Sequence, residues 1–342
     1  MNTLADEVES SESQSGCLNS FAALLAASAV LPLVLFIASQ LGRFLFVCEL
    51  VSNFQLFIFI GLLPFPVLLV LMKRWVWALV LGIATAWSGL LVASVYLPNV
   101  QPPPGDTVVR IMSYNVLVSN VRYRESLEEI RDVDPDILVV CEYDREWHDM
   151  LSVIHEDYPH RITLPRWHGF GIAIMSKLPI DSHEVVQLGN VVDKKGKRIK
   201  MTDNPCPVVK LKIGDRMVRV VGFHSLSPMN QQRMTLRNLQ FRELGEYLSQ
   251  EDMPTILLGD LNCTAWSYFL KKDLLEQAKL FDSRQGIGYQ GTWRADLEPF
   301  TIPIDHALVS RHIHVHDRWT GRAGGSDHRP IVVEVSVSPD EN

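Results

Sequence analysis

Six short stretches of this sequence place a carboxylate, an amide or an imidazole group at the end of an apolar run. These residues are Asn115 in SYNV, Glu142 in VVCEYD, His224 in VVGFHS, Asp260 and Asn262 in TILLGDLN, Asp305 in TIPIDHALVS, and Asp327 and His328 in GGSDHRPIVVEV. Carboxylate and amide oxygens suit a hard divalent cation such as Mg²⁺. Imidazoles without cysteine partners suit proton transfer or phosphate contact. Hydrolysis of a phosphate ester needs a metal, an activated water and groups that bind the non-bridging oxygens, so these residue types point to that reaction.

A single polar residue at a strand end carries little information, because Asp and Asn also start turns. Six such stretches, mostly at the carboxyl edge of strands, favour one common site, since ligands bind at that edge in open sheets. Asp260 and Asn262 are two residues apart, so both side chains lie on one face of an extended strand. Asp327 and His328 are adjacent and are expected to point to different sides, while Gly324–Ser326 let the backbone approach a phosphate.

The elements that must position these residues mix strands with helices. Strands are predicted at 108–116, 136–143, 170–177, 208–213, 219–225, 254–262, 303–310 and 330–337, each a short apolar run. One helix is predicted where leucines and a tyrosine recur at helical spacing, at Leu236, Leu239, Leu244, Tyr247 and Leu248, and a second at 124–133. This mixture indicates an α/β or α+β layered fold.

The first hundred residues have a different composition. Three uncharged apolar runs, Phe21–Leu41, Phe54–Met72 and Trp75–Leu97, are each close to the ~20 residues that cross a bilayer. A buried helical core is the alternative, but soluble helices alternate polar and apolar faces and these runs do not. Residues 1–20 are acidic and lack the basic start of a signal peptide. We therefore predict a disordered tail at 1–20 and three transmembrane helices within 21–97.

Charge and proline content give the expected topology and domain boundary. Lys73 and Arg74 lie between the second and third runs, so the positive-inside rule places this turn in the cytoplasm and the chain after Leu97 outside it. The protein is thus expected in the cell (inner) membrane, multi-pass, with an extracytoplasmic catalytic domain. Consecutive prolines predict a stiff linker at 98–106, and 107–342 is long enough for one catalytic domain.

The predicted catalytic domain is acidic. The first 97 residues hold three of the 32 basic and five of the 39 acidic residues, which leaves a net charge of −5 beyond them. Such a domain has no global attraction to a polyanion. The basic run 193–200 is interpreted as a solvated loop. The five cysteines are scattered and predict no disulfide framework or zinc site. Four further histidines, His306, His312, His314 and His316, are interpreted as surface residues of strands rather than metal ligands.

The motifs SYNVL, CEYD, GIAIMSK, GFHS, GDLN, PIDHALVS and GSDHRPI follow the order seen in the endonuclease/exonuclease/phosphatase superfamily, the DNase I-like enzymes. The resemblance covers Val108–Val337, and GDLN together with a terminal SDHRP is highly specific. It implies a four-layer α/β sandwich of two packed mixed sheets flanked by helices, here preceded by the three transmembrane helices. It also implies a metal-dependent phosphoric ester hydrolase that uses Mg²⁺ or Mn²⁺.

The resemblance assigns a metal-binding role to three residues. Glu142 resembles the principal Mg²⁺ ligand, Asn115 the amide that lines the metal site, and Asp327 a further acid beside the metal. His224 lies where DNase-like members keep a second histidine, which places this chain nearer to them than to exonuclease III-like members. No counterpart of the basic DNA-gripping insertions of the repair nucleases is present.

His224 and the other four residues resemble catalytic groups of the superfamily. Asp260 resembles the acid that orients or deprotonates the attacking water, and Asn262 its partner on the phosphate. His328 resembles the histidine that faces the scissile phosphate, and Asp305 the acid that holds that imidazole.

Three functions are consistent with these patterns. The first is a membrane-anchored phosphohydrolase that cleaves a phosphoester or pyrophosphate bond of an envelope or lipid-linked substrate. Similar three-span anchors occur on superfamily members associated with glycopeptide resistance, whose expected substrates are lipid-linked pyrophosphates. The second is a membrane-tethered DNase I-like endonuclease or exonuclease, against which the negative charge argues. A non-catalytic binding module is disfavoured, because every catalytic position is filled. The expected protein is a monomer whose partners are the lipid bilayer and a phosphorylated small molecule or lipid.

Overall fold

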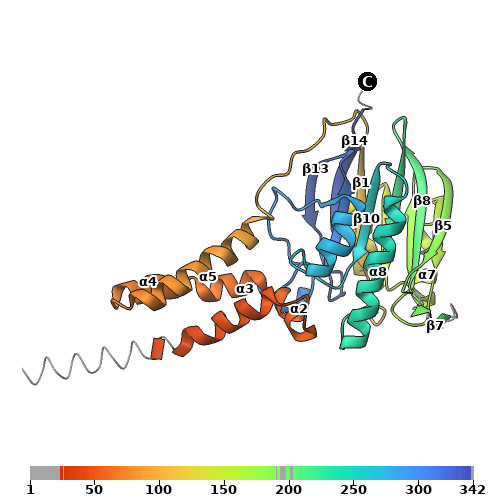
Figure 1. Cartoon of the computed structure of the whole chain (residues 1–342). Coiled ribbons are helices and arrows are strands. Elements are labelled where there is room, and N and C mark those ends of the chain that lie inside the picture. The colour runs from red at the N-terminus through yellow and green to blue at the C-terminus, as the bar shows by residue number, and fades with distance from the viewer. Residues whose placement is uncertain (1–23, 26, 190, 193–197, 201–202, 340–342) are drawn as a thin grey trace, which may run out of the picture. The chain divides into compact units, whose positions relative to one another are not determined.

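The computed structural model describes residues 24–25, 27–189, 191–192, 198–200 and 203–339 (Figure 1). The chain divides into two compact units, Met1–Ser94 and Val95–Asn342, which are described separately here. The predicted acidic tail, 1–20, and most of the basic run, 193–197, lie outside the described residues.

The N-terminal unit is helical, as its apolar composition predicts. Its described helices are Ala27–Gln40, α2 (Phe46–Ser52), α3 (Gln55–Leu62), α4 (Pro64–Leu71) and α5 (Trp75–Ala93). A buried polar chain links three of these segments: Ser39 Oγ donates to Gln55 Oε1 (3.1 Å), and Gln55 Nε2 donates to Ser88 Oγ (2.6 Å). Interhelical hydrogen bonds of this kind are typical of helices that associate in apolar surroundings.

The prediction of three membrane spans is supported only for the third. Among the described residues, α5 alone is long and apolar enough to cross a membrane by itself, with 19 residues. The second predicted run continues from α2 through a bend of 73°, and the two segments make one more span only if they are taken together. Within the described residues, the helix Ala27–Gln40 is shorter than the ~20 residues that a span needs, and positions 21–23 and 26 of the first predicted run lie outside them. The second run is interrupted by Pro64, which begins α4 because proline lacks the N–H that a helix interior requires.

The second unit contains two mixed six-stranded sheets, as the resemblance implied. Sheet A has the order β13 (Ile313–Thr320), β14 (Ile331–Val337), β1 (Val108–Asn115), β2 (Ile137–Cys141), β4 (Ile172–Ser176), β3 (His160–Leu164). Sheet B has the order β11 (Leu280–Asp282), β12 (Asp305–Ser310), β10 (Thr255–Asp260), β9 (Arg216–Gly222), β8 (Pro205–Ile213), β5 (Ile180–Gln187). A separate pair, β6 (Val191–Val192) and β7 (Arg198–Lys200), completes the described strands.

Three apolar clusters show how the layers stack. The central cluster combines side chains of both sheets, among them Ile111, Val139, Val220 and Ile256, so the sheets pack face to face. The outer face of sheet A packs against α6 (Tyr123–Val133) and α7 (Arg145–Leu151). The outer face of sheet B packs against α8 (Gln231–Ser249), η2 (Leu270–Leu275) and α9 (Glu276–Ala278), and α8 is seen in front of this sheet in Figure 1. Because both faces of each sheet are covered, the central strands are apolar throughout rather than alternating.

All eight predicted strands and both predicted helices are present, with boundaries shifted by a few residues. The strands β3, β5, β6, β7, β11 and β13 were not predicted. β5 shows why: most of its side chains are exposed or half-buried, so it lacks the apolar run used to recognise the others. Five short helical segments among the described residues of this unit were also not predicted: α7, η1 (Ser152–Ile154), η2, α9 and η3 (Ala295–Leu297).

The proline-rich stretch 98–106 contains no helix or strand and follows the edge formed by β13 and β14. Gln101 Oε1 accepts a hydrogen bond from the Val315 N–H (2.7 Å), and the Gly105 N–H donates to Ser336 Oγ (2.9 Å). The stretch is therefore held against sheet A, and this occupies part of the exposed edge strand β13.

Candidate active site

Every residue of the predicted site lies at one end of the sandwich. Asn115 ends β1, and Glu142 directly follows β2, which is parallel to β1 with Asn115 opposite Cys141. Asp260 ends β10 and lies opposite Asp305, which begins the antiparallel strand β12. The remaining members, His224, Asn262, Asp327 and His328, stand in loops at the same end, after β9 and β10 and before β14.

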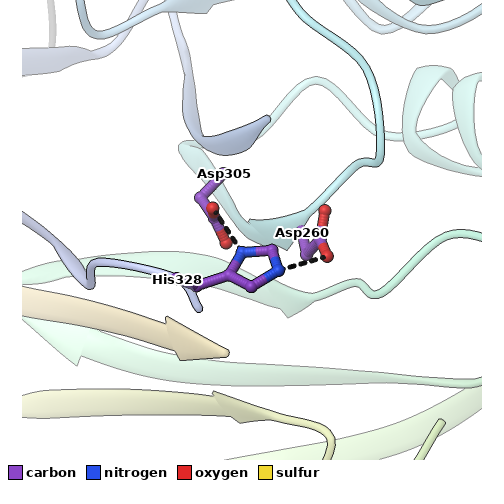
Figure 2. A group of neighbouring side chains, drawn as sticks. All are labelled: Asp260, Asp305 and His328. Atoms are coloured by element: carbon purple, nitrogen blue, oxygen red, sulfur yellow. Dashed lines mark hydrogen bonds and ion pairs between the residues drawn. The ribbon is translucent and has the colours of Figure 1, made fainter. Parts of the chain in front are cut away.

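Three buried side chains form the centre of the site (Figure 2). His328 Nδ1 lies 2.9 Å from Asp305 Oδ2, and His328 Nε2 lies 3.8 Å from Asp260 Oδ2. The imidazole thus stands between two carboxylates that face each other across neighbouring strands. Two like charges at such a cross-strand position repel, and a proton on His328 offsets that repulsion.

Asn115 connects the two sheets through its amide. Its Nδ2 lies 3.1 Å from both Glu142 Oε1 and Asp260 Oδ2, and 3.4 Å from His328 Nε2. Its Oδ1 accepts a hydrogen bond from the Leu117 N–H at 3.1 Å, which holds the amide in this orientation. One side chain at the end of β1 therefore contacts Glu142, Asp260 and His328.

Glu142 is held in an uncommon backbone conformation. Its φ of 60° lies in the left-handed region, which costs a non-glycine residue of order 1–3 kcal/mol. Its Oε2 accepts a hydrogen bond from the Val118 N–H (2.9 Å). A Cβ placed on Gly169 would lie 3.3 Å from the same oxygen, so the loop after β3 covers this carboxylate closely.

Asp327 has one satisfied and one unsatisfied carboxylate oxygen. Oδ2 accepts from Trp293 Nε1 at 3.0 Å, whereas Oδ1 is buried without a hydrogen-bond partner among the described residues and lies 3.9 Å from His328 Nε2. Ser326 shapes the loop: its Oγ donates to the Asn115 carbonyl (2.7 Å) and accepts from the His328 N–H (3.0 Å). An orphaned buried oxygen next to this centre is the feature that a bound cation would satisfy.

His224 and Asn262 border the centre on the sheet B side. His224 Nε2 lies 3.6 Å from Asp260 Oδ2, and its Nδ1 is buried without a partner among the described residues. The ring of His224 packs against Phe170, with centroids 5.3 Å apart. Asn262 has a φ of 51°, and its backbone N–H donates to Asp260 Oδ1 (2.8 Å) while its Nδ2 donates to the Ser225 carbonyl (3.1 Å).

Burial and mutual charge shift the pKa values of this group. Burial raises the pKa of Asp260 to about 7, against the lowering influence of His328. For His328 burial acts downward, but Asp305 and Asp260 outweigh it and raise the pKa to about 10. Burial lowers the pKa of His224. At neutral pH the site therefore holds a protonated His328, a neutral His224 and an Asp260 that can take up or release a proton.

The donor set fits a hard divalent cation. Glu142 and Asp327 offer carboxylate oxygens, and Asp327 Oδ1 accepts no hydrogen bond from a described residue. The Asn115 amide lines this group, with its Nδ2 toward Glu142 and its Oδ1 on the Leu117 N–H. A second group, Asp260, Asp305 and His328, brings one ligand atom from each residue within 4.8 Å of the others. In this second group the Asp305–His328 contact is already a hydrogen bond, so we regard the first group as the better metal site.

The structure corrects one interpretation and adds residues that sequence reasoning missed. His306 is not a surface residue: it is fully buried, its Nε2 lies 2.8 Å from the Cys263 carbonyl, and its Nδ1 lies 3.5 Å from Asp282 Oδ2. All six residues of β12 are buried, which the alternation of polar and apolar residues did not reveal. Trp293 and Ser326 contact the site but stand in loops without a recognisable pattern, so only their position identifies them.

A comparison of sequences places the chain in a family. Residues 112–328, more than half of the chain, match the model of the Endonuclease/Exonuclease/phosphatase family. The chain belongs to this family, whose members hydrolyse phosphoester bonds and typically depend on a divalent metal. No curated protein matches the chain.

Solved structures share the fold of the second unit. An endonuclease/exonuclease/phosphatase from Beutenbergia cavernae DSM 12333 has 18% sequence identity and a TM-score of 0.54, covering 68% of this chain and 72% of that one. The human Nocturnin catalytic domain with bound sulfate has 18% identity and a TM-score of 0.55, covering 68% and 95%. D. rerio TDP2 complexed with a single-strand DNA product has 15% identity and a TM-score of 0.55, covering 68% and 100%. At these identities the similarity establishes the fold and not the substrate.

Proposed function

We propose that this protein is a membrane-anchored phosphohydrolase that depends on Mg²⁺ or Mn²⁺ and cleaves a phosphoester or pyrophosphate bond in an envelope or lipid-linked substrate. The observation that carries the proposal is the buried Asp305–His328 pair facing Asp260, because it places a cation and a proton acceptor side by side. Hydrolysis of a phosphate ester requires a cation that binds the phosphate oxygens and a base that accepts the proton of the attacking water, and both must act on the same phosphate group.

Each residue has a role that follows from its surroundings. Glu142, Asn115 and Asp327 would hold the divalent ion, which when bound neutralises phosphate charge and increases the acidity of a coordinated water. Asp260 would orient the attacking water and accept its proton, because a pKa of about 7 suits a base at neutral pH. Protonated His328 would donate a hydrogen bond to a non-bridging oxygen as negative charge increases there.

Two further residues would complete the phosphate site. Asn262 is positioned by its backbone hydrogen bond to Asp260 and would contact the phosphate from that side. His224 is buried and its pKa is lowered, so it would act as a neutral hydrogen-bonding group rather than a second cation.

Membrane anchoring is the second part of the proposal. It rests on α5, an uncharged helix of 19 residues that begins with Trp75 directly after Lys73 and Arg74. Basic residues at the start of a span favour the cytoplasmic side, so the second unit would be extracytoplasmic. A substrate of the cell envelope follows from that location.

A tethered nuclease is the second candidate. It is favoured by the similarity to D. rerio TDP2, whose solved structure contains a single-strand DNA product. The net charge of −5 beyond residue 97 argues against it, because a polyanion is repelled at low salt.

One assay tests these alternatives. The full chain, purified in detergent, is incubated with Mg²⁺ or Mn²⁺ and with bis(p-nitrophenyl) phosphate, single-stranded DNA, a phospholipid and a lipid pyrophosphate. We expect metal-dependent turnover of the soluble diester and of a lipid substrate, and its loss in His328→Ala. Preference for DNA by more than about tenfold would select the nuclease, and full turnover in EDTA would refute the proposal.

A further inference from the structure

Four loops at the site end of the second unit each carry one strongly exposed apolar side chain. These are Val121 after β1, Trp167 after β3, Met229 after β9 and Phe300 before β12, with exposed fractions of 76%, 87%, 74% and 67%. Burying apolar surface is favourable at roughly 25 cal/mol per Å², so four large side chains exposed at one end of the unit would gain free energy from contact with an apolar partner. We call these four residues the apolar rim.

Two rim residues, Val121 and Trp167, have chain neighbours that contact the site from the side of sheet A. Val121 lies between Asn120, whose Nδ2 donates to the Gly324 carbonyl (3.3 Å), and Arg122, which borders Gly325. Both contacts are with the loop that carries Asp327 and His328. Trp167 stands two residues before Gly169, which covers the Glu142 carboxylate.

The other two rim residues, Met229 and Phe300, lie in loops that follow strands of sheet B and carry or contact residues of the site. Met229 belongs to the loop that joins His224 to α8, and Arg233 links this loop to Phe170: its Nε donates to the Ser227 carbonyl (3.0 Å) and its guanidinium lies 5.7 Å from the Phe170 ring. Phe300 lies in the loop between β11 and β12, which also carries Trp293, the hydrogen-bond donor to Asp327. The four residues of the apolar rim therefore lie in four separate loops, each of which carries or contacts a residue of the site.

The path of the chain brings the start of the second unit to this same end. The Val95 carbonyl accepts from the Gly286 N–H (3.2 Å), and the Tyr96 ring lies directly against Gly288, in the loop between β11 and β12. β12 begins at Asp305, so this loop belongs to the site end of sheet B. In the sequence, only Ser94 separates Val95 from the last residue of α5.

Positive charge lies near the rim, at Arg122 and Arg166 in two of its loops and at Arg233 in the first turn of α8. Arg122 is exposed, and Arg233 is half-buried; neither makes an ion pair with a described residue. Arg166 is paired with Asp203 at 3.3 Å, and this carboxylate is largely exposed. Basic side chains next to exposed apolar ones are the combination that binds an anionic lipid surface, since each contributes a separate attraction.

We propose that the apolar rim is a lipid-docking surface: Val121, Trp167, Met229 and Phe300 enter the interface of an anionic bilayer and bring the catalytic centre to phosphates at the headgroup level. This inference rests on the proposed function and specifies it, because it makes the substrate a membrane-embedded phosphoester. A bilayer is favoured over a second copy of the chain because the unit begins at this end, one residue after a helix that suits a membrane.

The test uses the full chain in vesicles of phosphatidylcholine and phosphatidylglycerol that contain a phosphorylated lipid. The variant combines Trp167→Ser, Met229→Ser and Phe300→Ser, and none of these residues belongs to the catalytic centre. We expect hydrolysis of the embedded lipid to fall at least about tenfold, because the rim no longer enters the interface. Hydrolysis of bis(p-nitrophenyl) phosphate in the same vesicles should change less than twofold.

A control replaces two other exposed apolar residues away from the rim, with Val108→Ser and Val153→Ser. Val108 begins β1, about 23 Å along the strand from the site at Asn115. The control should hydrolyse both substrates as the native chain does. An equal loss of lipid hydrolysis in the rim variant and the control, or a loss of both substrates in the rim variant, would overturn the docking surface.

A binding measurement separates this inference from the catalytic proposal. Lipids brominated near the headgroup quench tryptophan fluorescence in the vesicles, and the quenched fraction is compared between the native chain and Trp167→Phe. A smaller quenched fraction in the variant supports docking even if no substrate is hydrolysed. Equal quenching in the two proteins would refute the inference. It would also be refuted if the rim variant lost only self-association, which would indicate a second copy as the occupant, or lost only the turnover of soluble DNA, which would indicate a nucleic acid.

Discussion

His328 Nδ1 and Asp305 Oδ2 lie 2.9 Å apart, and this hydrogen bond joins the loop before β14 of sheet A to the first residue of β12 of sheet B. Both side chains are buried, so the pair is little screened by water. The carboxylate helps to keep the imidazole protonated, and the pKa of His328 rises to about 10.

The first prediction concerns this pair. His328→Ala should lower kcat on bis(p-nitrophenyl) phosphate by several orders of magnitude with little change in KM, because the contact strengthens in the transition state. Asp305→Asn should cause a smaller loss and move the alkaline limb of the pH–rate profile to lower pH, since the variant lacks the carboxylate that raises the pKa of His328. Steady-state kinetics between pH 5 and 10 measure both effects.

The double variant decides whether Asp305 acts only through His328. It should be no slower than His328→Ala alone, because a residue that works through another has no effect once that other is gone. If the two losses multiply, Asp305 has an independent role, for example on the metal or the water.

The second prediction concerns metal affinity. Glu142→Gln and Asp327→Asn should each weaken Mn²⁺ binding at least about tenfold, because each removes one charged oxygen donor. Isothermal titration in detergent gives the dissociation constants. Glu128→Gln is the control, since this acid is half-exposed and pairs with Arg124 on α6. Unchanged affinity in both site variants would indicate that the metal binds instead to Asp260, Asp305 and His328.

The third prediction concerns Trp293, which the sequence did not single out. Trp293→Phe removes the hydrogen bond to Asp327 Oδ2 but keeps an aromatic ring in place. Groups that orient metal ligands typically contribute about tenfold to affinity, and a weakening of that size is expected here. Trp319→Phe on β13 is the matched control. Equal affinities in the two variants would mean that the indole N–H does not position Asp327.

The fourth prediction is a pH dependence of stability measured in EDTA. The folded pKa of His328, about 10, lies above its unfolded value of about 6.5, so its stabilising contribution is complete below pH ~6.5 and is lost as the pH rises towards 10. The difference in thermal midpoint between the native chain and His328→Gln should therefore be larger at pH 6 than at pH 10. A difference that grows with pH would contradict the protonated state assigned to His328.

The fifth prediction concerns topology. Reporter fusions placed after residue 97 should give an extracytoplasmic signal, because Lys73 and Arg74 precede α5. A cytoplasmic signal would reverse the orientation and direct the search for substrates to cytosolic phosphates.

Local sequence patterns identified much of the fold. Strands buried on both faces, such as β2 and β10, consist of continuous apolar runs. A polar residue marks the end of each run in the sequence: Glu142 directly follows β2, and Asp260 ends β10. The exposed strand β5 and the bulged edge strand β13 lack such runs, so they were not found. The three apolar runs were visible as well, but composition does not report the bend of 73° between α2 and the segment that follows it.

The sequence by itself determined which residue types stand at strand ends, and this was enough to list the eight residues that the fold brings to one end of the sandwich. Only the tertiary structure decided their partners. Asp305 meets His328 across 23 positions of the chain, and Asn115 meets Asp260 across 145. Such contacts depend on strand order and on the packing of one sheet upon the other, which are set by the whole core rather than by any local pattern. The same reason explains why the burial of His306 and the hydrogen bond from Trp293 to Asp327 became apparent only in the folded chain.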